Sequence, residues 1–340
     1  MKLEGTGLVN KNNYHLKKFI ITYLLLLTAI LYSQTKIIFT AIDYSNNEVR
    51  AAICDRDGNN RNELGFNKTY LPAWFNDKIL LNSDTFIWQC DTSGANLTKL
   101  FPGYRVSISN NKKMFAFYDQ NGIGISNEKG KIIKQLIINA FEDVAITWSK
   151  EDDKVSYFDP DKKICYLFNL TNDSLELFGD SIYHPLWNPV NDYVLFNRAS
   201  AENKFEIFLQ RSDSAKSKVI INKKDENAVV PIWSNNGSKI AYLSFKTALD
   251  NFPESDLYPC NLVLYDIEKR SSQIISGDAG FTDKAFPQMC FDEQDEYIYF
   301  TKINEAGLGS ITRINLRTLM QETISKDLNF DERFPQVMSF

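Results

Sequence analysis

The chain has 340 residues, of which 44% are hydrophobic and 24% charged, the composition of a globular protein with a sizeable core. Aromatic residues make up 13% and favour β-strands. The formal net charge is −5. An acidic surface is a poor match for nucleic acid or anionic lipid, so we predict no nucleic-acid partner.

Residues 1–33 have the pattern of a secretory signal peptide. Lys17 and Lys18 precede an apolar run over residues 19–32, and Ser33 supplies a small residue for cleavage. Removing this segment takes away four Lys and one Glu and leaves 34 basic and 42 acidic residues, a net charge of −8. The run is shorter than the about 20 residues of a spanning helix. We predict cleavage near Ser33, a periplasmic or extracellular location and no membrane span in the mature chain, with an N-terminal membrane anchor as the alternative.

From residue 36 onward one pattern recurs, which we call the Trp motif: an apolar strand ending in Trp-Ser or a related pair, a polar turn, and a second apolar strand. Its seven copies begin, in chain order, at Pro72, Val106, Ile146, Pro185, Pro231, Phe286 and Phe334. A second hairpin follows each copy, such as residues 262–275, and its turns contain Gly, Asn and Asp. Two hairpins make a four-stranded antiparallel sheet, and roughly 44 residues per unit fits a β-propeller repeat.

The copy at the C-terminus is incomplete, and its continuation lies near the start of the chain. Residues 334–340 resemble residues 286–291, which are followed by a strand at 297–303, and the matching strand occurs at residues 36–42. We predict an all-β fold for a single domain over residues 34–340, a seven-bladed propeller of four-stranded blades. Pairing of the C-terminal strand with the N-terminal blade would close it and cover strand edges. Six or eight blades, or an open β-sandwich, are the alternatives.

The phrase Trp233-Ser234-Asn235-Asn236-Gly237-Ser238-Lys239-Ile240-Ala241-Tyr242 resembles the Trp-Ser-Pro-Asp-Gly-x-x-Ile-Ala-Phe signature of TolB-like propellers. These are also called WD-like periplasmic repeats, and they occur in the propeller domains of prolyl oligopeptidase-type peptidases. Trp187-Asn188-Pro189 keeps the Pro of the signature. The resemblance covers residues 36–340 and implies the fold more specifically than the function. TolB itself has six blades and a small α/β domain, so the resemblance does not extend to TolB as a whole.

Catalytic and metal-binding patterns are sparse. Beyond the predicted signal segment His184 is the only histidine, so a Ser-His-Asp triad would depend on it. The nucleophile elbow Gly-x-Ser-x-Gly is absent, and we expect no α/β-hydrolase half after the propeller. One histidine also falls short of the histidine-rich metal site of propeller-type oligogalacturonate lyases. Asp55-Arg56-Asp57-Gly58 begins like a calcium loop, but Phe66 occupies the place of the bidentate Glu. We therefore predict no catalytic residue, metal or cofactor, and a protein that is not an enzyme.

The remaining polar features are interpreted as structural. The five cysteines are widely spaced and without a zinc pattern, so we interpret them as small buried residues, with Cys260 as the most accessible. Carboxylate clusters such as Glu151-Asp152-Asp153 and Asp292-Glu293 fall in turns of the Trp motif, where we expect them to be solvated.

Binding is expected in the loops around the central channel, because propellers carry function on loops held by a rigid scaffold. These loops are acidic and contain aromatic residues, a mixture found at protein interfaces. For His184 we retain two interpretations, a ligand contact at the channel mouth and a structural histidine packed beside Trp187. The candidate binding residues are Asp143, Tyr183, His184, Phe252, Tyr258, Phe281, Asp283, Lys284, Asp331 and Arg333.

Two functions fit this sequence. The first is a non-catalytic interaction module of the cell envelope that binds another envelope protein or a peptide. The second is a carbohydrate-binding or carbohydrate-active propeller, with carboxylates and aromatic platforms clustered in the channel. The sparse histidine content favours the first.

Overall fold

In the part of the chain that it describes, the computed structural model contains 28 β-strands. It describes residues 35–138, 145–159, 161–200, 204–212, 214, 216–222, 225–246, 257–282 and 287–338. Within these residues there is no helical segment with the length and hydropathy that a membrane crossing requires. The predicted signal segment 1–33 lies outside the described residues.

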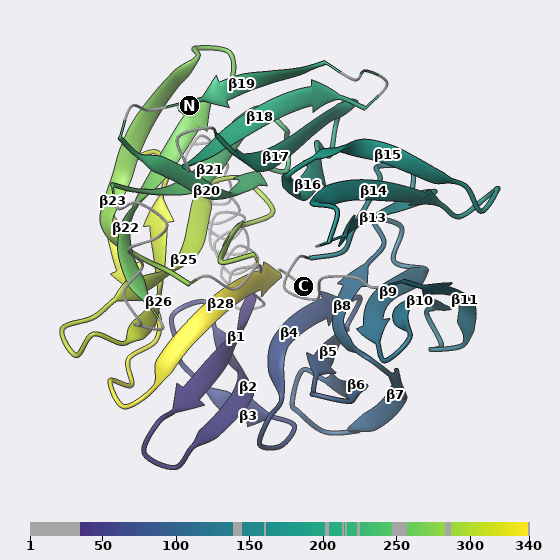
Figure 1. Ribbon diagram of the computed structural model, residues 1–340. Helices are drawn as coiled ribbons and strands as arrows, with labels where there is room; N and C mark the ends of the chain where they lie inside the picture. The colour runs from purple at the N-terminus through teal and green to yellow at the C-terminus, as the bar shows by residue number, and fades with distance from the viewer. Residues whose placement is uncertain are drawn as a thin grey trace, which may run out of the picture.

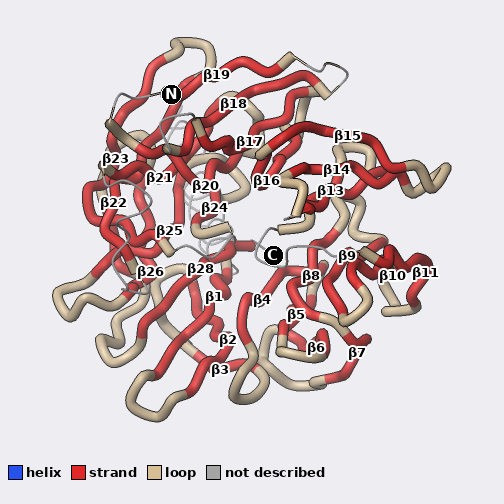
Figure 2. Tube along the Cα trace, in the orientation of Figure 1, coloured by secondary structure: helices blue, strands red, loops and turns tan. Residues whose placement is uncertain are grey.

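The strands form five four-stranded antiparallel sheets and one eight-stranded sheet (Figure 2). The first sheet has the order β28 (Asp331–Met338), β1 (Lys36–Asp43), β2 (Glu48–Asp55) and β3 (Asn62–Leu64). The next contains β4 (Tyr70–Phe75), β5 (Lys78–Asn82), β6 (Phe86–Asp91) and β7 (Thr98–Pro102). It is followed by β8 (Tyr104–Ile108), β9 (Met114–Asp119), β10 (Gly122–Asn127) and β11 (Ile132–Ile137).

The second half of the chain repeats this order. One sheet contains β12 (Thr147–Trp148), β13 (Lys154–Asp159), β14 (Ile164–Asn169) and β15 (Leu175–Asp180). The next contains β16 (Ile182–Trp187), β17 (Tyr193–Ala199), β18 (Phe205–Arg211) and β19 (Ser217–Ile221). The eight-stranded sheet begins with β20 (Asn227–Trp233), β21 (Lys239–Phe245), β22 (Tyr258–Asp266) and β23 (Ser271–Phe281). It continues with β24 (Met289–Phe291), β25 (Tyr297–Ile303), β26 (Gly309–Asn315) and β27 (Gln321–Thr323).

The sheets are arranged radially, with the first strand of each sheet toward the middle of the molecule (Figure 1). The eight-stranded sheet consists of two four-stranded halves, β20–β23 and β24–β27, joined by the single residue pair Ala279↔Lys302. The predicted all-β fold of four-stranded antiparallel sheets is therefore confirmed.

The first and last strands that the structure describes pair in one sheet. β28 pairs with β1 from Lys36↔Met338 to Ile42↔Asp331, with one irregularity between Ile38 and Thr40. This is the pairing that the split repeat predicts between residues 36–42 and 334–340. β28 is the innermost strand of this sheet, in the position that β4 and β8 occupy in the next two (Figure 1).

The core lies between sheets rather than inside any one of them. Most residues of second strands such as β1 are buried on both faces, which is why these strands are near-continuous apolar runs. Each hydrophobic cluster joins neighbouring sheets or sheet halves; one, for example, packs Tyr118 and Ile125 against Trp148 and Tyr157. The first and last parts of the array also touch, because Phe39 of β1 shares a cluster with Tyr299, Ile311 and Ile324.

The cysteines are core residues in the main. Cys54, Cys90, Cys165 and Cys260 are buried, and Cys290 is half-buried. The expectation that Cys260 is the most accessible is wrong: it lies in β22, its side chain is 5% exposed, and burial raises the pKa of its thiol. β22 begins at Tyr258, so Cys260 belongs to the strand and packs in its core.

Candidate functional site

Five of the inner strands share a backbone irregularity at the same position of the repeat. One residue in each of β4, β8, β16, β20 and β28 has a left-handed conformation, and the strand pairing slips at that point. These bulge residues are Leu71 (φ 46°), Arg105 (φ 53°), His184 (φ 51°), Val230 (φ 50°) and Phe334 (φ 60°). A left-handed β-branched residue such as Val230 is a genuine outlier. Each such residue costs about 1–3 kcal/mol and persists only where the surroundings hold it.

Polar side chains of the second strands hold the bulges in place. The backbone N–H of Leu71 donates to Thr40 Oγ1 (2.9 Å). The amide of Asn82 donates to the Leu71 carbonyl (2.6 Å) and its Oδ1 accepts from the N–H of Val106 in the next sheet (2.9 Å). Asn197 donates to the carbonyl of Ala228 in the inner strand of the next sheet (2.7 Å), two residues before the bulge at Val230. Thr40, Asn82 and Asn197 are buried, so these bonds satisfy backbone groups that water cannot reach.

The bulges direct their side chains toward a common cavity. A bulge re-aims a side chain relative to the regular strand. All five bulge residues line one cavity of about 340 Å³, whose other walls come from the inner strands and include Pro72, Ile108, Trp148, Trp187 and Ile232. These strands surround the middle of the molecule, where β28 also ends (Figure 1). The volume is at the lower end of the about 300–1,000 Å³ of ligand pockets.

Tryptophans tie the walls of this central cavity to one another. The indole Nε1 of Trp148 donates to the carbonyl of Ser107 in the preceding inner strand (3.2 Å). Trp233 donates to the Leu186 carbonyl (2.9 Å), and Trp74 to the Gln336 carbonyl across the two chain ends (3.4 Å). The Trp that marks the repeat therefore has a structural task, the linking of one inner strand to the next.

His184 has an unusual electrostatic setting. Part of its ring faces the central cavity, but protein atoms surround it, and this desolvation lowers its pKa from 6.5 to about 4. The imidazole is therefore neutral at pH 7.

The lowered pKa of His184 predicts loss of stability in mild acid. The folded state disfavours the imidazolium. The contribution of His184 to the free energy of unfolding is therefore complete above pH 6.5 and is lost as the pH falls toward 4. Between pH 7 and 4.5 we expect His184 to account for about 2 kcal/mol of lost unfolding free energy. Urea unfolding of the wild type and of His184→Asn at both pH values measures this loss. Asn is chosen because it tolerates the left-handed backbone of residue 184. Parallel pH dependence in the two proteins would contradict the assignment.

Of the predicted binding residues that the structure describes, His184 is the one that lines the central cavity. The predicted aromatic residues pack against one another: Tyr183 against Phe158 (4.7 Å between ring centroids), and Tyr258 and Phe281 against Phe245 (both 5.4 Å). Asp143, Phe252, Asp283 and Lys284 lie outside the described residues.

Asp331 and Arg333 form a buried ion pair at the start of β28, with exposures of 1% and 6%. The Nε of Arg333 donates to Asp331 Oδ1 (2.9 Å), and the same carboxylate accepts from Tyr44 Oη and from the N–H of Gly309 (both 2.9 Å). The structure thus places both side chains in a network that fixes β28, away from the central cavity.

The sequence-based list of binding residues omitted the other four bulge residues, because it was drawn from loops and these residues lie in inner strands. A signal was present in the sequence: four of the five bulge residues immediately precede the first residue of the Trp motif, and the fifth, Phe334, is that first residue. Pro follows four of them, namely Leu71, His184, Val230 and Phe334. A residue before Pro is restricted in conformation, so a recurring X-Pro at an inner strand marks an irregular backbone.

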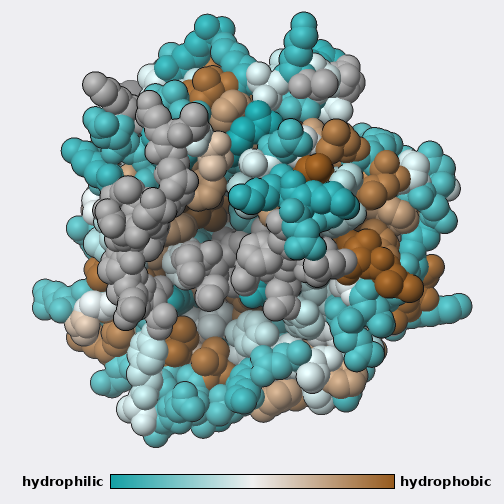
Figure 3. Space-filling view, viewed as in Figure 1, coloured by the Kyte–Doolittle hydropathy of each residue, from teal (hydrophilic) through white to brown (hydrophobic). Residues whose placement is uncertain are grey.

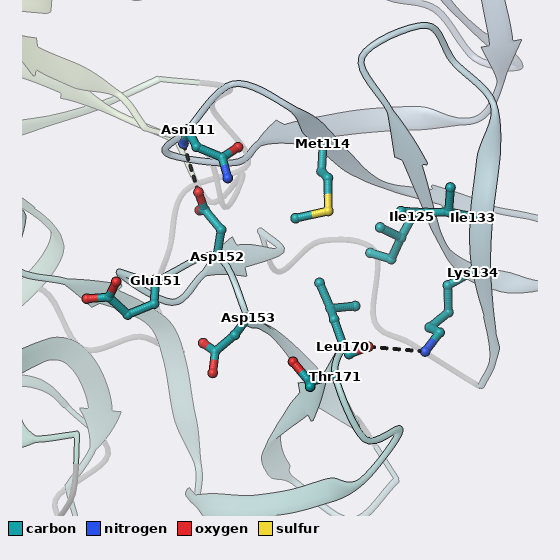
Figure 4. Close-up of a pocket in the computed structure, with 10 residues that line it drawn as sticks. All are labelled: Asn111, Met114, Ile125, Ile133, Lys134, Glu151, Asp152, Asp153, Leu170 and Thr171. Atoms are coloured by element: carbon teal, nitrogen blue, oxygen red, sulfur yellow. Dashed lines mark hydrogen bonds between the residues drawn. The ribbon is translucent and has the colours of Figure 1, made fainter.

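A second cavity, of about 530 Å³, lies between the sheets β8–β11 and β12–β15 (Figure 4). Met114, Ile125, Ile133 and Leu170 form its apolar wall. Figure 3 shows apolar side chains on the right of the view, where Figure 1 places these sheets. They include exposed residues of the outer strands, namely Ile132, Ile133, Ile137, Leu175 and Leu177.

The expectation that the turn carboxylates are solvated is wrong for Asp152 and Asp292, which are 6% and 8% exposed. Asp152 accepts hydrogen bonds from the N–H and amide of Asn110 (2.7 and 2.8 Å) and from the N–H of Asn111 (2.8 Å; Figure 4). Asp295 does the same for Asn235. The position of these carboxylates in a turn predicts solvent exposure from one sheet alone, but the preceding sheet or sheet half covers the turn.

Comparison with known proteins identifies the fold. The chain matches no protein family and none of the curated proteins. It is similar to TolB from Acinetobacter baumannii, with a TM-score of 0.57 and 13% identity over 90% of this chain and 67% of TolB. The match to a puromycin-hydrolysing peptidase of Mycobacterium tuberculosis has a TM-score of 0.62 and 10% identity. It covers 86% of this chain and 53% of the peptidase, so the chain spans about half of that enzyme. The match to the β-propeller domain of the Trilobed protease from Pyrococcus furiosus has a TM-score of 0.61 and 12% identity. It covers 86% of this chain and 94% of that domain.

The prediction that the chain is not an enzyme is corrected by these similarities. Propellers of this shape occur in peptidases, among them the puromycin-hydrolysing peptidase and the Trilobed protease. A propeller sequence without a triad motif can therefore belong to an enzyme, and the missing motif does not separate this chain from that class. What the similarities share is architecture, and on that evidence the chain has a β-propeller fold similar to that of TolB.

Proposed function

We propose that this chain is an exported seven-bladed propeller that binds another envelope protein through its central cavity. Five four-stranded sheets and the two halves of the eight-stranded sheet make seven blades. The β28–β1 pairing and the packing of Phe39 against Tyr299 and Ile311 support a closed ring. Residues 1–33 have the signal-peptide pattern that export requires.

One observation carries the proposal: five strained bulges, in five different inner strands, all line the same cavity. Strained backbone destabilises the fold, and strained residues cluster at functional sites. Their recurrence around one cavity therefore supports a function for that cavity. The bulges replace the regular inner edge of each blade with one projecting side chain, and together these side chains define the shape of the cavity.

The character of the wall favours a protein segment over a glycan. Apolar and aromatic side chains such as Ile108, Trp148, Trp187 and Ile232 dominate it. The carboxylates that a carbohydrate-active channel would gather do not occur among its described lining residues. Apolar side chains with a few polar groups match the pockets that receive the anchor residues of a partner protein.

Filling the cavity tests the proposal. Ala73→Phe adds a ring to the cavity wall, and Ala306→Phe makes the same change in an exposed turn. We expect the immobilised full chain and Ala306→Phe to retain the same envelope protein from an extract, and Ala73→Phe to retain at least tenfold less, with unfolding midpoints showing that all three are folded. Equal retention by Ala73→Phe, or retention on a glycan array with no protein retained, would refute the proposal.

A further inference from the structure

The central cavity contains one charged side chain among its described lining residues, that of Arg105. The other polar lining groups are neutral: His184, uncharged at neutral pH, and the side chains of Asn82, Ser107, Asn110, Thr147 and Gln336. A single guanidinium in an otherwise uncharged cavity makes the site selective for a ligand with one negative charge. The whole-protein charge, formally −5, has the opposite sign, so this preference is local to the cavity.

The backbone positions Arg105 for this task. It is the bulge residue of β8, where the register slips between Tyr104 and Ser107, so its side chain leaves the regular pattern of the strand. The hydrogen bond from the next residue, Val106, to the buried Asn82 fixes the backbone immediately beside it. Arg105 also interacts elsewhere in the chain. A guanidinium has five N–H donors, so that interaction and a bidentate contact with a ligand can coexist.

The surroundings strengthen such a contact. Trp148, Trp187 and Ile108 line the same cavity and lower the local dielectric, in which an ion pair is stronger than in water. Arginine and carboxylate form two parallel hydrogen bonds, which fix the orientation as well as the affinity of the ligand. The neutral His184 does not compete for the anion.

We infer that Arg105 binds the C-terminal carboxylate of the partner protein, whose last residues are apolar and occupy the cavity. This inference rests on the proposed function, since it names the part of the partner that enters. To place an internal Asp or Glu beside Arg105, the partner chain would have to both enter and leave a cavity of about 340 Å³. A C-terminal carboxylate requires the chain only to enter. The polar groups of Ser107 and Gln336 supply partners for the peptide bonds of the entering segment.

The test uses the full chain and three probes: N-acetyl-Leu-Phe with a free carboxylate, the same dipeptide as its amide, and decanoate. Binding is followed by tryptophan fluorescence, because Trp148 and Trp187 lie in the cavity wall. Arg105→Gln removes the guanidinium. Arg270→Gln is the matched control, since Arg270 is also left-handed (φ 51°) but lies exposed in a turn.

We expect the wild type and Arg270→Gln to bind the free acid at least tenfold more tightly than the amide, and more tightly than decanoate. In Arg105→Gln the acid should fall to the affinity of the amide, with amide binding unchanged. Equal binding of acid and amide by the wild type, an acid preference that survives in Arg105→Gln, tighter binding of decanoate, or no binding of either dipeptide would each overturn the inference. Loss of partner retention by Ala73→Phe is measured separately, so failure here is distinguishable from failure of the proposed function.

Discussion

The Gly58→Ala variant is expected to lose about 4 kcal/mol or more of unfolding free energy. Gly58 lies in the β2–β3 turn with φ +75°, and a Cβ built there would sit 1.9 Å from the backbone carbonyl oxygen of Ile324, beyond β27. Because the obstacle is backbone, it cannot rotate away, and the turn must separate from the last part of the array. Arg313, which donates to the Arg56 carbonyl (3.3 Å), would lose its contact at the same junction.

Gly307→Ala is the matched control for this change. Its φ is +77°, nearly that of Gly58, but beyond its two chain neighbours no atom lies within 4 Å of the added Cβ. This variant should lose only about 1–2 kcal/mol of unfolding free energy, the penalty for an alanine in the left-handed conformation. Urea unfolding of the full-length variants measures both values. Equal losses would mean that the turn of the first sheet does not touch the last, contrary to a ring that brings the two chain ends together.

Asp152→Asn should cost about 2–3 kcal/mol, the second large effect. The carboxylate accepts three hydrogen bonds from Asn110 and Asn111, and an amide in its place presents an N–H to at least one of those donors. Asn tolerates the left-handed backbone of Asp152 (φ 58°), so the change isolates the hydrogen bonds from backbone strain.

Glu151→Gln removes a charge from the neighbouring exposed residue and should change stability by less than about 0.5 kcal/mol. Thermal and urea unfolding of the two variants compare them. A loss of the same size in both would show that the net charge of the turn, and not the contact with the preceding sheet, determines its contribution.

The repeat organisation could be predicted from sequence because it depends on local patterns. The Trp motif, the polar turns and the apolar second strands recur at a regular spacing, and the match between residues 334–340 and 286–291 was enough to anticipate the pairing of β28 with β1. Each of these features is a property of one segment, and strand period and turn chemistry report it directly.

The candidate site was harder to predict because it depends on contacts between segments. Val230 and Leu71 have ordinary apolar side chains, and only the left-handed backbone brings them to the cavity. Asp331 and Arg333 have charges typical of a loop, yet they pair with each other in a buried strand end. Asp152 occupies a turn, and nothing in its spacing indicates that the preceding sheet supplies three donors.

Photo-crosslinking from inside the cavity tests most directly whether the partner binds there. A photoreactive phenylalanine analogue is placed at Leu186, in the cavity wall, and at Leu177, which is 65% exposed on the outer strand β15. After irradiation in envelope extract, mass spectrometry locates the crosslinked residues. We predict adducts from position 186 within the last few residues of one partner protein, and none of that protein from position 177. Adducts from position 177 alone, or from position 186 to internal segments of unrelated proteins, would contradict binding through the central cavity.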